Sequence, residues 1–532
     1  MNELLEGWTL AKLEELCISP RQDIVDGPFG SNLKASEYVD AGIPIIRLQN
    51  VKRNRFIEHN LRFITPNKAD DLSRHSFRAG DIVITKLGSP LGEACLVPPS
   101  LEFGIIVADV VRARISENHI SKLFTVFAIN SPAVINQLSL EVKGSTRPRV
   151  NLSHIRSLEI PLAPLNEQYR IVAKLEKLLG NVEACQQRLE KIPRILKRFR
   201  QAILAAACSG KLTADWRGHN VIKETALEWL IQVVEKRRLQ YEAERVSLES
   251  GKTKKTKRPN YLSYDIKDCE ASDGIPSTWI KAPIGLLCDC IVPGRDKPNS
   301  FSGSIPWITL PDITNLYIQN SASGLYLTEE EVQEVNARII PPESVIMSCI
   351  GRFGISAIVC TPLVVNQQLH AFLKSELILP EYLAYHIQTL ERYMIDISTS
   401  TTISYLNKDN CNSLPINLPP LEEQHEIVRR VESLFKIADK LEERYRKAKE
   451  HVDKLTQSIL VKAFRGELVP TEAELARQEG RDYEPASALI ERIKHERALR
   501  QKSDKTSRNS RKRQSEITRD PPPERSVTKL FT

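Results

Sequence analysis

One segment of the chain occurs twice, 256 residues apart, and this repeat is the strongest constraint on the fold. The sequence Pro-Leu-Asn-Glu-Gln-Tyr-Arg-Ile-Val at 164–172 returns as Pro-Leu-Glu-Glu-Gln-His-Glu-Ile-Val at 420–428. The register still holds where Gly-Lys-Leu at 210–212 matches Gly-Glu-Leu at 466–468. A repeat of this length is a structural module. Two modules in one chain predict pseudo-twofold symmetry, and therefore a partner that is itself two-fold or bipartite.

The repeated segment is predicted to be a long helix with a coiled-coil seam. Apolar residues recur in steps of three and four over about six heptads, from Ile171 to Ala206 in the first copy and from Ile427 to Ile459 in the second. Such a stripe stays buried only when helices pair, and an antiparallel pair gives the chain the shortest path from the first helix to the region before the second. Pro193 lies inside the first helix. We therefore expect a kink there and none in the second helix.

The regions before the two helices are diverged copies of each other. Their matches are sparse but ordered, for example Trp8 with Trp279 and Cys17 with Cys288. Short apolar runs bounded by Gly and Pro alternate with helical stretches, which predicts a mixed α/β globule in each region. The expected fold class is α+β, with two such globules separated by a long antiparallel helix pair.

The predicted boundaries follow the repeat. We expect a first globule at 1–158, a first long helix at 159–215, a helical extension and basic linker at 216–274, a second globule at 275–413, a second long helix at 414–470, and a helical extension with a charged tail at 471–532. The composition from about Lys502 onward is typical of disorder. The basic run Lys252–Arg258 could clamp phosphates, but we interpret it as a solvated linker.

Composition narrows the functional classes. The net charge of +8 is compatible with a polyanionic partner without requiring one. The N-terminal residues do not form a signal peptide, and no apolar run approaches the ~18 residues of a membrane span, so we expect a cytoplasmic protein without membrane contact. Ten cysteines occur without any Cys-x-x-Cys pair, which predicts reduced thiols and no metal site.

A search for catalytic motifs finds none that is complete. Gly251-Lys252-Thr253 resembles the end of a P-loop, but Val246 stands where the first glycine is needed. Glu141-Val142-Lys143 could belong to a nuclease site, yet no well-placed Asp precedes it. The chain contains no Gly-x-Ser-x-Gly elbow. We therefore interpret it as a binding protein. The alternatives are a nucleic-acid-modifying enzyme with an unrecognised active site and a coiled-coil scaffold without a DNA role.

Several motifs resemble those of the specificity subunits of type I restriction-modification systems. They are the two Pro-Leu-x-x-Gln helix starts, the loop 145–151, Gly27–Lys34, 80–84 and 366–368, and the resemblance covers about 1–215 and 275–470. It implies that each globule is a target-recognition domain that reads one half of a split double-stranded DNA sequence. It also implies that methyltransferase and restriction subunits assemble on a chain that has no active site. S-adenosylmethionine, ATP and Mg would belong to those partners, and this chain would hold no cofactor. The pseudo-symmetric helix pair predicts two methyltransferase copies.

Candidate DNA-contacting residues follow from the donors that base reading needs. Arg pairs with guanine and Asn or Gln with adenine, whereas Lys and backbone N–H groups meet phosphates. The loop Gly144–Asn151 supplies arginines and its counterpart Ser400–Asn407 supplies hydroxyls, as two different half-sites would require. The candidates are Lys34, Arg47, Gln49, Asn50, Arg147, Arg149, Asn151, Thr309, Thr402 and Asn407.

Overall fold

The computed structural model of the chain describes residues 4–88, 90–140, 149–249, 259–269, 274–294, 296–399 and 404–517. The chain forms two compact units, each of mixed helix and sheet. Unit 1 comprises Met1–Leu189 and Ala448–Thr532, and unit 2 comprises Glu190–Lys447. The boundaries cut through a long helix pair, so each unit contains one end of that pair.

The globule of unit 1 is built on two four-stranded sheets, because short β-branched and aliphatic runs alternate with tight turns. One sheet has the order β6 (Arg62–Ile64), β3 (Ile43–Ile46), β10 (Phe103–Ile106), β7 (Ser76–Arg78), and the other has the order β2 (Ile24–Asp26), β11 (Val110–Ala113), β8 (Ile82–Thr85), β9 (Ala94–Leu96). Two further pairs are β1 (Thr9–Lys12) with β12 (Glu159–Leu162), and β4 (Val51–Lys52) with β5 (Arg55–Phe56). Strands β3 and β10 run parallel. Strands β8 and β11 are buried along their whole length and form the centre of their sheet.

Helix α3 (Lys122–Ile129) lies at the centre of the core of unit 1. Its Phe124 ring contacts the rings of Trp8 and Phe464, with centroid distances of 6.3 and 5.3 Å. The globule therefore shares one core with the end of the second long helix. The other helical elements of the unit are α1 (Pro20–Asp23), η1 (Leu13–Leu16), η2 (Ala35–Glu37), η3 (Leu48–Asn50), α2 (Pro66–Asp71), η4 (Ser73–His75), α4 (Pro132–Leu140), α5 (Leu152–Arg156), α6 (Leu165–Leu189), α16 (Glu472–Glu479) and α17 (Ala486–Ile517).

Unit 2 contains a five-stranded and a three-stranded sheet. The five-stranded sheet has the order β14 (Cys290–Ile291), β21 (Leu369–Phe372), β18 (Val345–Ser348), β19 (Ser356–Val359), β16 (Tyr317–Ile318). The three-stranded sheet has the order β17 (Tyr326–Leu327), β15 (Ile305–Ile308), β20 (Val364–Val365). Strand β13 (Ile280–Pro283) pairs with β22 (Pro415–Leu418). The helical elements are α7 (Ile192–Cys208), α8 (Ala214–His219), α9 (Ala226–Glu249), η5 (Asn260–Ser263), η6 (Ile266–Asp268), α10 (Ile284–Leu287), η7 (Leu310–Asp312), α11 (Glu329–Glu334), α12 (Pro380–Thr389), α13 (Glu391–Asp396), α14 (Lys408–Asn412) and the first part of α15 (Leu421–Ala463). Trp279, Tyr382 and Tyr385 are its largest buried side chains.

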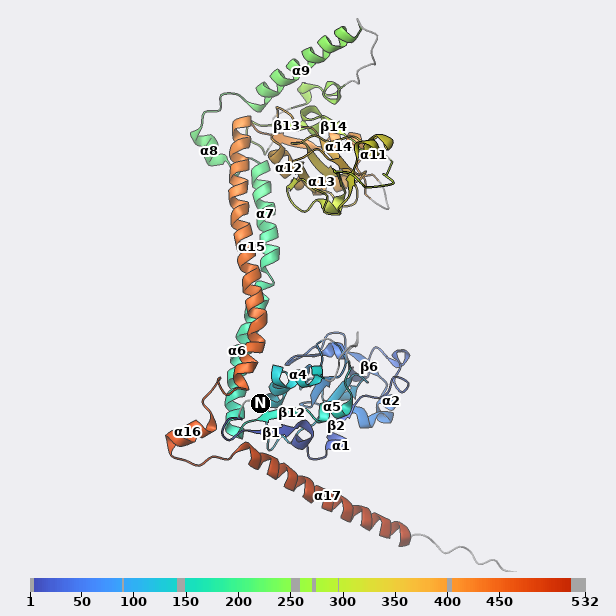
Figure 1. Cartoon of the computed structure of the whole chain (residues 1–532), viewed down its shortest axis with the longest axis vertical. Helices are drawn as coiled ribbons and strands as arrows, with labels where there is room; N and C mark the ends of the chain where they lie inside the picture. Colours follow the sequence, from blue (N-terminus) through green and yellow to red (C-terminus); the bar gives the residue numbers. More distant parts are fainter. Residues whose placement is uncertain are drawn as a thin grey trace, which may run out of the picture. The chain divides into compact units, whose positions relative to one another are not determined.

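The long helices run antiparallel within each unit (Figure 1). In unit 2, Ile203 near the end of α7 and Ile427 near the start of α15 belong to one core. In unit 1, Leu175 near the start of α6 and Leu460 near the end of α15 belong to another. Helix α15 is unbroken over 43 residues, whereas the first helix ends at Leu189 and restarts at Ile192. The predicted interruption near Pro193 is confirmed. Pro193 lies in the first turn of α7, where its missing N–H is tolerated.

The predicted seam is buried at its ends but not along its whole length. Ile171 and Ile427 are fully buried, whereas Phe199 is 36% exposed and Leu441 is 44% exposed. Continuous burial of the stripe, as the heptad pattern predicted, is therefore not found. The physical reason is that two helices cover only one side of each other, so apolar residues near the edge of the contact stay open to solvent.

Helix α17 corrects the prediction of disorder from Lys502. The helix continues to Ile517, because 486–517 contains no Pro or Gly and is rich in Lys, Arg, Glu and Gln, which favour helix. Its buried first turns supply the costly nucleus from which the helix propagates. Residues 518–532 and the basic run Lys252–Arg258 lie outside the described residues. In the described part of the chain, no helix is both long and apolar enough to cross a membrane.

Candidate nucleic-acid interface

A hollow of about 280 Å³ on unit 1 brings together two segments that were predicted separately. One is Gly27–Lys34, and the other is the turn η3 that follows β3. Gly27 lets the first segment pack against the turn between β10 and β11, because a Cβ atom there would lie 2.1 Å from backbone atoms of Val107. The hollow is lined by Pro28, Gly30, Leu33, Tyr38, Arg47, Leu48, Gln49, Val107, Ala108 and Asp109.

Arg149 joins this hollow through Asp109. Its guanidinium donates a hydrogen bond of 2.9 Å to Asp109 Oδ1 while more than half of the arginine side chain remains exposed. The backbone of Arg149 is held by a bridge to Leu87, and the neighbouring Val150 N–H donates to the Lys86 carbonyl over 3.0 Å. A guanidinium carries five N–H donors. Arg149 is therefore fixed at the rim of the hollow with donors available to an external acceptor.

An ion pair between a buried lysine and a partly buried aspartate supports this rim. Lys86 Nζ donates to Asp26 Oδ2 over 2.6 Å, and the Lys86 side chain is buried. The Lys86 N–H donates to the Asp109 carbonyl over 3.0 Å. Sequence reasoning missed both Lys86 and Asp109. These two residues come together only when the strands pack, and they belong to no recognisable motif. The single signal in the sequence is the position of Asp109 between two apolar runs, where a turn is expected.

The exposed candidates on unit 1 differ in how freely they can meet a ligand. Gln49 lines the hollow and is exposed, and Lys34 is exposed next to the lining residue Leu33. Arg47 is half-buried, and its guanidinium donates to the Asn60 carbonyl over 2.6 Å. Because a guanidinium has several donors, this bond orients Arg47 toward the loop without using its full capacity.

Asn50 has a structural role, which corrects its place among the candidates. It is fully buried, its Oδ1 accepts from the Arg47 N–H over 3.0 Å, and its Nδ2 donates to the Ile57 carbonyl over 2.8 Å. Both ends of the amide are used to hold the turn η3. A side chain in this position cannot reach a base edge without unfolding the turn.

The corresponding turn of unit 2, η7 after β15, has different chemistry. Thr309 Oγ1 donates to Asp312 Oδ2 over 2.6 Å, and Asp312 Oδ1 accepts from the Ser323 N–H over 2.8 Å. Burial alone would raise the pKa of Asp312, but hydrogen bonds from Ser323 and Thr309 outweigh burial and lower this pKa. The carboxylate is thus occupied by its neighbours, and Thr309 keeps acceptor capacity only.

The matched pair Asn151 and Asn407 caps two short helices. Asn151 Oδ1 accepts from the His154 N–H over 3.0 Å at the start of α5, and Asn407 Oδ1 accepts from the Asn410 N–H over 2.7 Å at the start of α14. N-capping is a sufficient reason for Asn at both places. The candidates Arg147 and Thr402 lie outside the described residues.

Burial shifts the pKa values of several cysteines and histidines among the described residues. Burial raises the pKa of Cys95 and of Cys208 to about 12, so both thiols stay protonated and unreactive. Burial also lowers the pKa of His370 and of His386 to about 4. Among the described residues, no three His, Cys, Asp or Glu side chains gather as metal ligands. The chemistry that unit 1 offers is hydrogen bonding and positive charge at an open rim.

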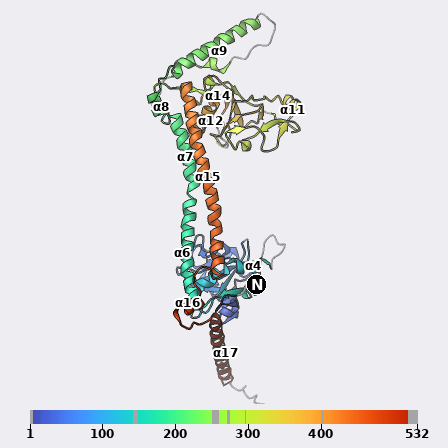
Figure 2. The ribbon, with the colours of Figure 1, turned by 60° about the vertical axis from the view of Figure 1, so that its left-hand side comes forward.

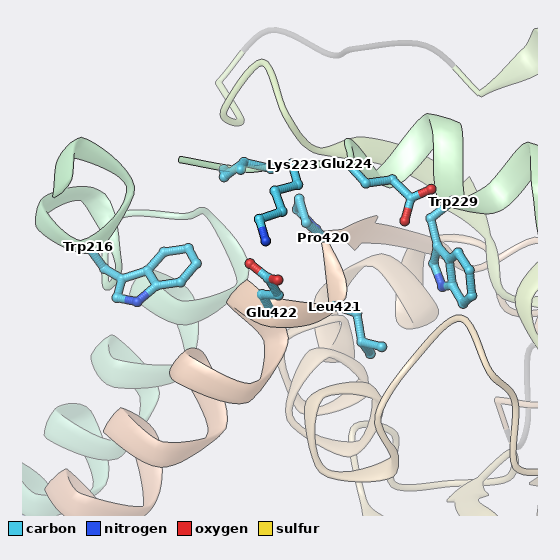
Figure 3. Close-up of a pocket in the computed structure, with 8 residues that line it drawn as sticks. Trp216, Lys223, Glu224, Trp229, Pro420, Leu421 and Glu422 are labelled. Carbon is cyan, nitrogen blue, oxygen red and sulfur yellow. The ribbon is translucent and has the colours of Figure 1, made fainter. Parts of the chain in front are cut away.

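A second hollow, of about 310 Å³, lies in unit 2 at the start of α15. Figure 3 shows Trp216 and Trp229 on opposite sides of it, with the Lys223 ammonium and the Glu422 carboxylate pointing toward one another. Aromatic and aliphatic walls with a charged rim suit packing against a protein side chain. The lining residues are Trp216, Ile222, Lys223, Glu224, Trp229, Pro420, Leu421 and Glu422.

Comparison with known proteins identifies a family for this chain. The family model described as the type I restriction modification DNA specificity domain matches residues 6–194 and 276–449. The type I restriction enzyme EcoBI specificity subunit of Escherichia coli is 30% identical over 398 residues, which cover 73% of this chain and 74% of the relative. The EcoKI specificity subunit of Escherichia coli strain K12 is 27% identical over 523 residues, covering 93% and 97%.

Two solved structures share the fold. One is a chain from a study of complex assembly and conformational transition of the type I R-M system, with a TM-score of 0.58 and 19% identity over 88% of this chain and 100% of that chain. The other is the HsdS subunit from Thermoanaerobacter tengcongensis, with a TM-score of 0.50 and 20% identity over 87% and 98%.

Proposed function

This chain belongs to the family of the type I restriction modification DNA specificity domain, and we propose that it gives a type I restriction-modification complex its DNA sequence preference. The ligand in this proposal is double-stranded DNA with an asymmetric, split target. The two globules are diverged copies related by pseudo-twofold symmetry, each reads one half of the target, and the helix pair sets their spacing. The chain has no active site of its own and works in the cytoplasm.

One observation carries the assignment of the globules to two different half-sites. The turns η3 and η7 follow matched strands and are built in the same way. In unit 1 the turn presents Arg47 and Gln49 near Arg149. In unit 2 it presents Thr309 beside the Asp312 carboxylate, whose oxygens already accept hydrogen bonds. A forked guanidinium suits guanine and an amide suits adenine, whereas a hydroxyl makes a single contact. Two globules that share this turn but present different hydrogen-bonding side chains fit an asymmetric DNA target.

The proposed DNA contacts divide by chemistry. Base readers would be Arg149 and Gln49 with Arg147 and Arg47 in unit 1, whereas Lys34 would meet phosphate. In unit 2 the hydroxyls of Thr309 and Thr402 would contact the duplex. Asn151 and Asn407 would act mainly by fixing the helix starts beside these loops.

Exposed apolar side chains on the helix pair of unit 2 support a protein partner there. They are Ile195 (59% exposed) and Phe199 on α7, and Ile437 (49% exposed) and Leu441 on α15. On each helix the two residues are four apart and share a face. Arg200 on α7 contacts Asp439 and Glu442 on α15 at 2.7 and 2.8 Å, which brings these stretches side by side. We assign this surface to a methyltransferase subunit.

The remaining partners follow from the same proposal. The repeat supports two methyltransferase copies per chain, with restriction subunits added to that complex. S-adenosylmethionine, ATP and Mg are assigned to these partner subunits and none to this chain.

The test is reconstitution of the chain with its methyltransferase partner, followed by mass measurement and competition binding among DNA duplexes. Two methyltransferase copies and strong preference for one split sequence are expected. A stable one-to-one complex would contradict the stoichiometry. A complex without sequence preference would favour the scaffold alternative, and chain alone that consumes S-adenosylmethionine or cuts DNA would favour an enzyme.

A further inference from the structure

The first turns of helix α17 anchor it to unit 1. Leu489 and Ile493 are fully buried in the core of the unit. The Arg497 guanidinium donates to the carbonyls of Glu14 and Cys17 over 3.0 and 2.7 Å. Residues 498–503, which follow, are exposed. Figure 1 and Figure 2 both show α17 leaving the body of unit 1 and projecting from it.

The projecting segment, 498–517, has a composition that selects its partner. Its basic residues are Arg500, Lys502, Lys505, Arg508, Arg511, Lys512 and Arg513. Its acidic residues are Asp504 and Glu516, and its apolar residues are Ala498, Leu499 and Ile517. A helix that docks in a protein groove needs apolar anchors at helical spacing, which this sequence lacks. An excess of positive charge without an apolar stripe fits a polyanion.

We propose that 498–517 is a DNA arm that binds backbone phosphates of the duplex flanking the half-site read by unit 1, without reading sequence. This inference rests on the proposed function of that globule. A duplex carries about one negative charge per 1.7 Å of its axis, and Lys and Arg gain affinity there by releasing counterions. A helix of this length extends roughly 30 Å, or about nine base pairs at 3.4 Å each. The arm extends the footprint beyond the target.

Helix α9 shows that a basic outer part is not common to the two extension helices. The two helices begin alike: the Ala226 N–H donates to the Thr278 carbonyl over 3.1 Å, and the Ala486 N–H donates to the Gly7 carbonyl over 2.8 Å. The outer part of α9, however, mixes both signs. Its charged residues are Lys236, Arg237, Arg238, Glu242, Glu244, Arg245 and Glu249. Of these two helices, only α17 carries a strong positive excess; the basic run Lys252–Arg258 that follows α9 lies outside the described residues.

Duplexes of two lengths test the arm. One ends at the target sequence, as mapped by methylation, and the others carry about 20 extra base pairs on one side or the other. The wild-type chain should bind more tightly when one of the two flanks is present, and the plot of log K against log salt should steepen by about 0.9 for each added phosphate contact. Replacing Arg500, Lys505, Arg508 and Lys512 by Gln, which keeps helix propensity, should abolish both gains and leave preference for the target unchanged.

The matched control replaces four exposed lysines of α15, Lys440, Lys447, Lys449 and Lys454, by Gln and removes the same charge elsewhere. It should keep the gain from the flank, as should a chain that ends at Ile517. Equal affinity and salt slope for wild type and arm variant on the long duplexes would overturn the proposal, as would a wild-type chain that gains from neither flank. A duplex of about 30 base pairs with a random sequence distinguishes failure of the arm proposal from failure of the proposed function. If the arm binds phosphates, the plot of log K against log salt must be shallower for the arm variant than for the wild-type chain on this duplex, even if the chain has no specific target.

Discussion

The Trp279 indole Nε1 donates a hydrogen bond of 2.7 Å to Glu423 Oε2, which joins the start of the second globule to the first turn of α15. Trp8 and Glu167 form the same contact in unit 1 at 3.0 Å. Glu423 is fully buried and also accepts from Thr213 Oγ1 over 2.5 Å and from the Arg217 guanidinium. The carboxylate therefore ties three segments of unit 2 together.

Replacing Glu423 by Ala should lower the free energy of unfolding of unit 2 by about 3–5 kcal/mol, because Arg217 is left without its buried partner. Urea unfolding followed by tryptophan fluorescence measures the change. The control is Glu422→Ala, an exposed residue in the same helix turn, which should cost less than about 1 kcal/mol. Equal losses for the two variants would show that the buried network contributes no special stability.

Glu426 should make stability sensitive to acid. Arg429 Nε donates to Glu426 Oε2 over 2.7 Å and Arg430 Nε donates to Oε1 over 2.6 Å. These bonds outweigh burial and lower the pKa of Glu426 from 4.5 to about 2. Because the folded-state pKa lies below the unfolded-state pKa, the contribution is complete above pH 4.5 and is lost as the pH falls toward about 2.

The Glu426→Gln variant tests this contribution. Its free energy of unfolding should be lower than that of the wild type at neutral pH, and the difference should shrink between pH 4.5 and about 2. Chemical denaturation across that range provides the measurement. A difference that does not change with pH would contradict the ionic role of Glu426.

Arg149→Gln should remove about 1–3 kcal/mol of discrimination at one base pair of one half-site and leave the other half-site intact. Arg147→Ala should affect the same half-site. Arg55→Gln is the control, since Arg55 is an exposed arginine of the same globule that pairs with Glu183 at 3.0 Å. Competition binding with single-base variants of the target is the assay. Uniform weakening with a salt slope shallower by about 1 would assign Arg149 to phosphate instead.

Four residues inserted after Glu183 should lengthen α6 by about 6 Å. Heptad seams absorb such an insertion by local unwinding, so the helix pair should survive. The variant should recognise the same two half-sites with a gap longer by one or two base pairs, at about 3.4 Å per base pair. The same insertion after Gly480, in the turn between α16 and α17, should leave the gap unchanged. An unaltered gap in the α6 variant, with activity retained, would mean that the helices do not measure spacing.

The sequence predicts local features of this chain well, because they are encoded by neighbours. Pro193 marks the helix interruption, and the matched Trp8 and Trp279 occupy matched hydrogen bonds. The disorder assigned from Lys502 was wrong for the part that the structure describes, because composition alone does not register a packed helix start that can nucleate the rest.

Contacts that depend on tertiary packing could not be predicted. Asn50 has the right chemistry for adenine, yet the turn buries it and uses both ends of its amide. The Arg149–Asp109 pair forms because a turn between two buried strands meets a distant loop. The spacing of Arg149 and Asp109 in the sequence does not predict this contact. For Arg147 and Thr402 the roles remain sequence-based proposals.

Methylation sequencing of a host genome that carries the partner methyltransferase, with this gene present and deleted, tests whether this chain selects the DNA target. We expect methylation at one asymmetric target with two half-sites separated by a fixed gap, present with the gene and lost on its deletion. A methylation pattern that is unchanged by the deletion, or the loss of a motif that is not split, would contradict this expectation.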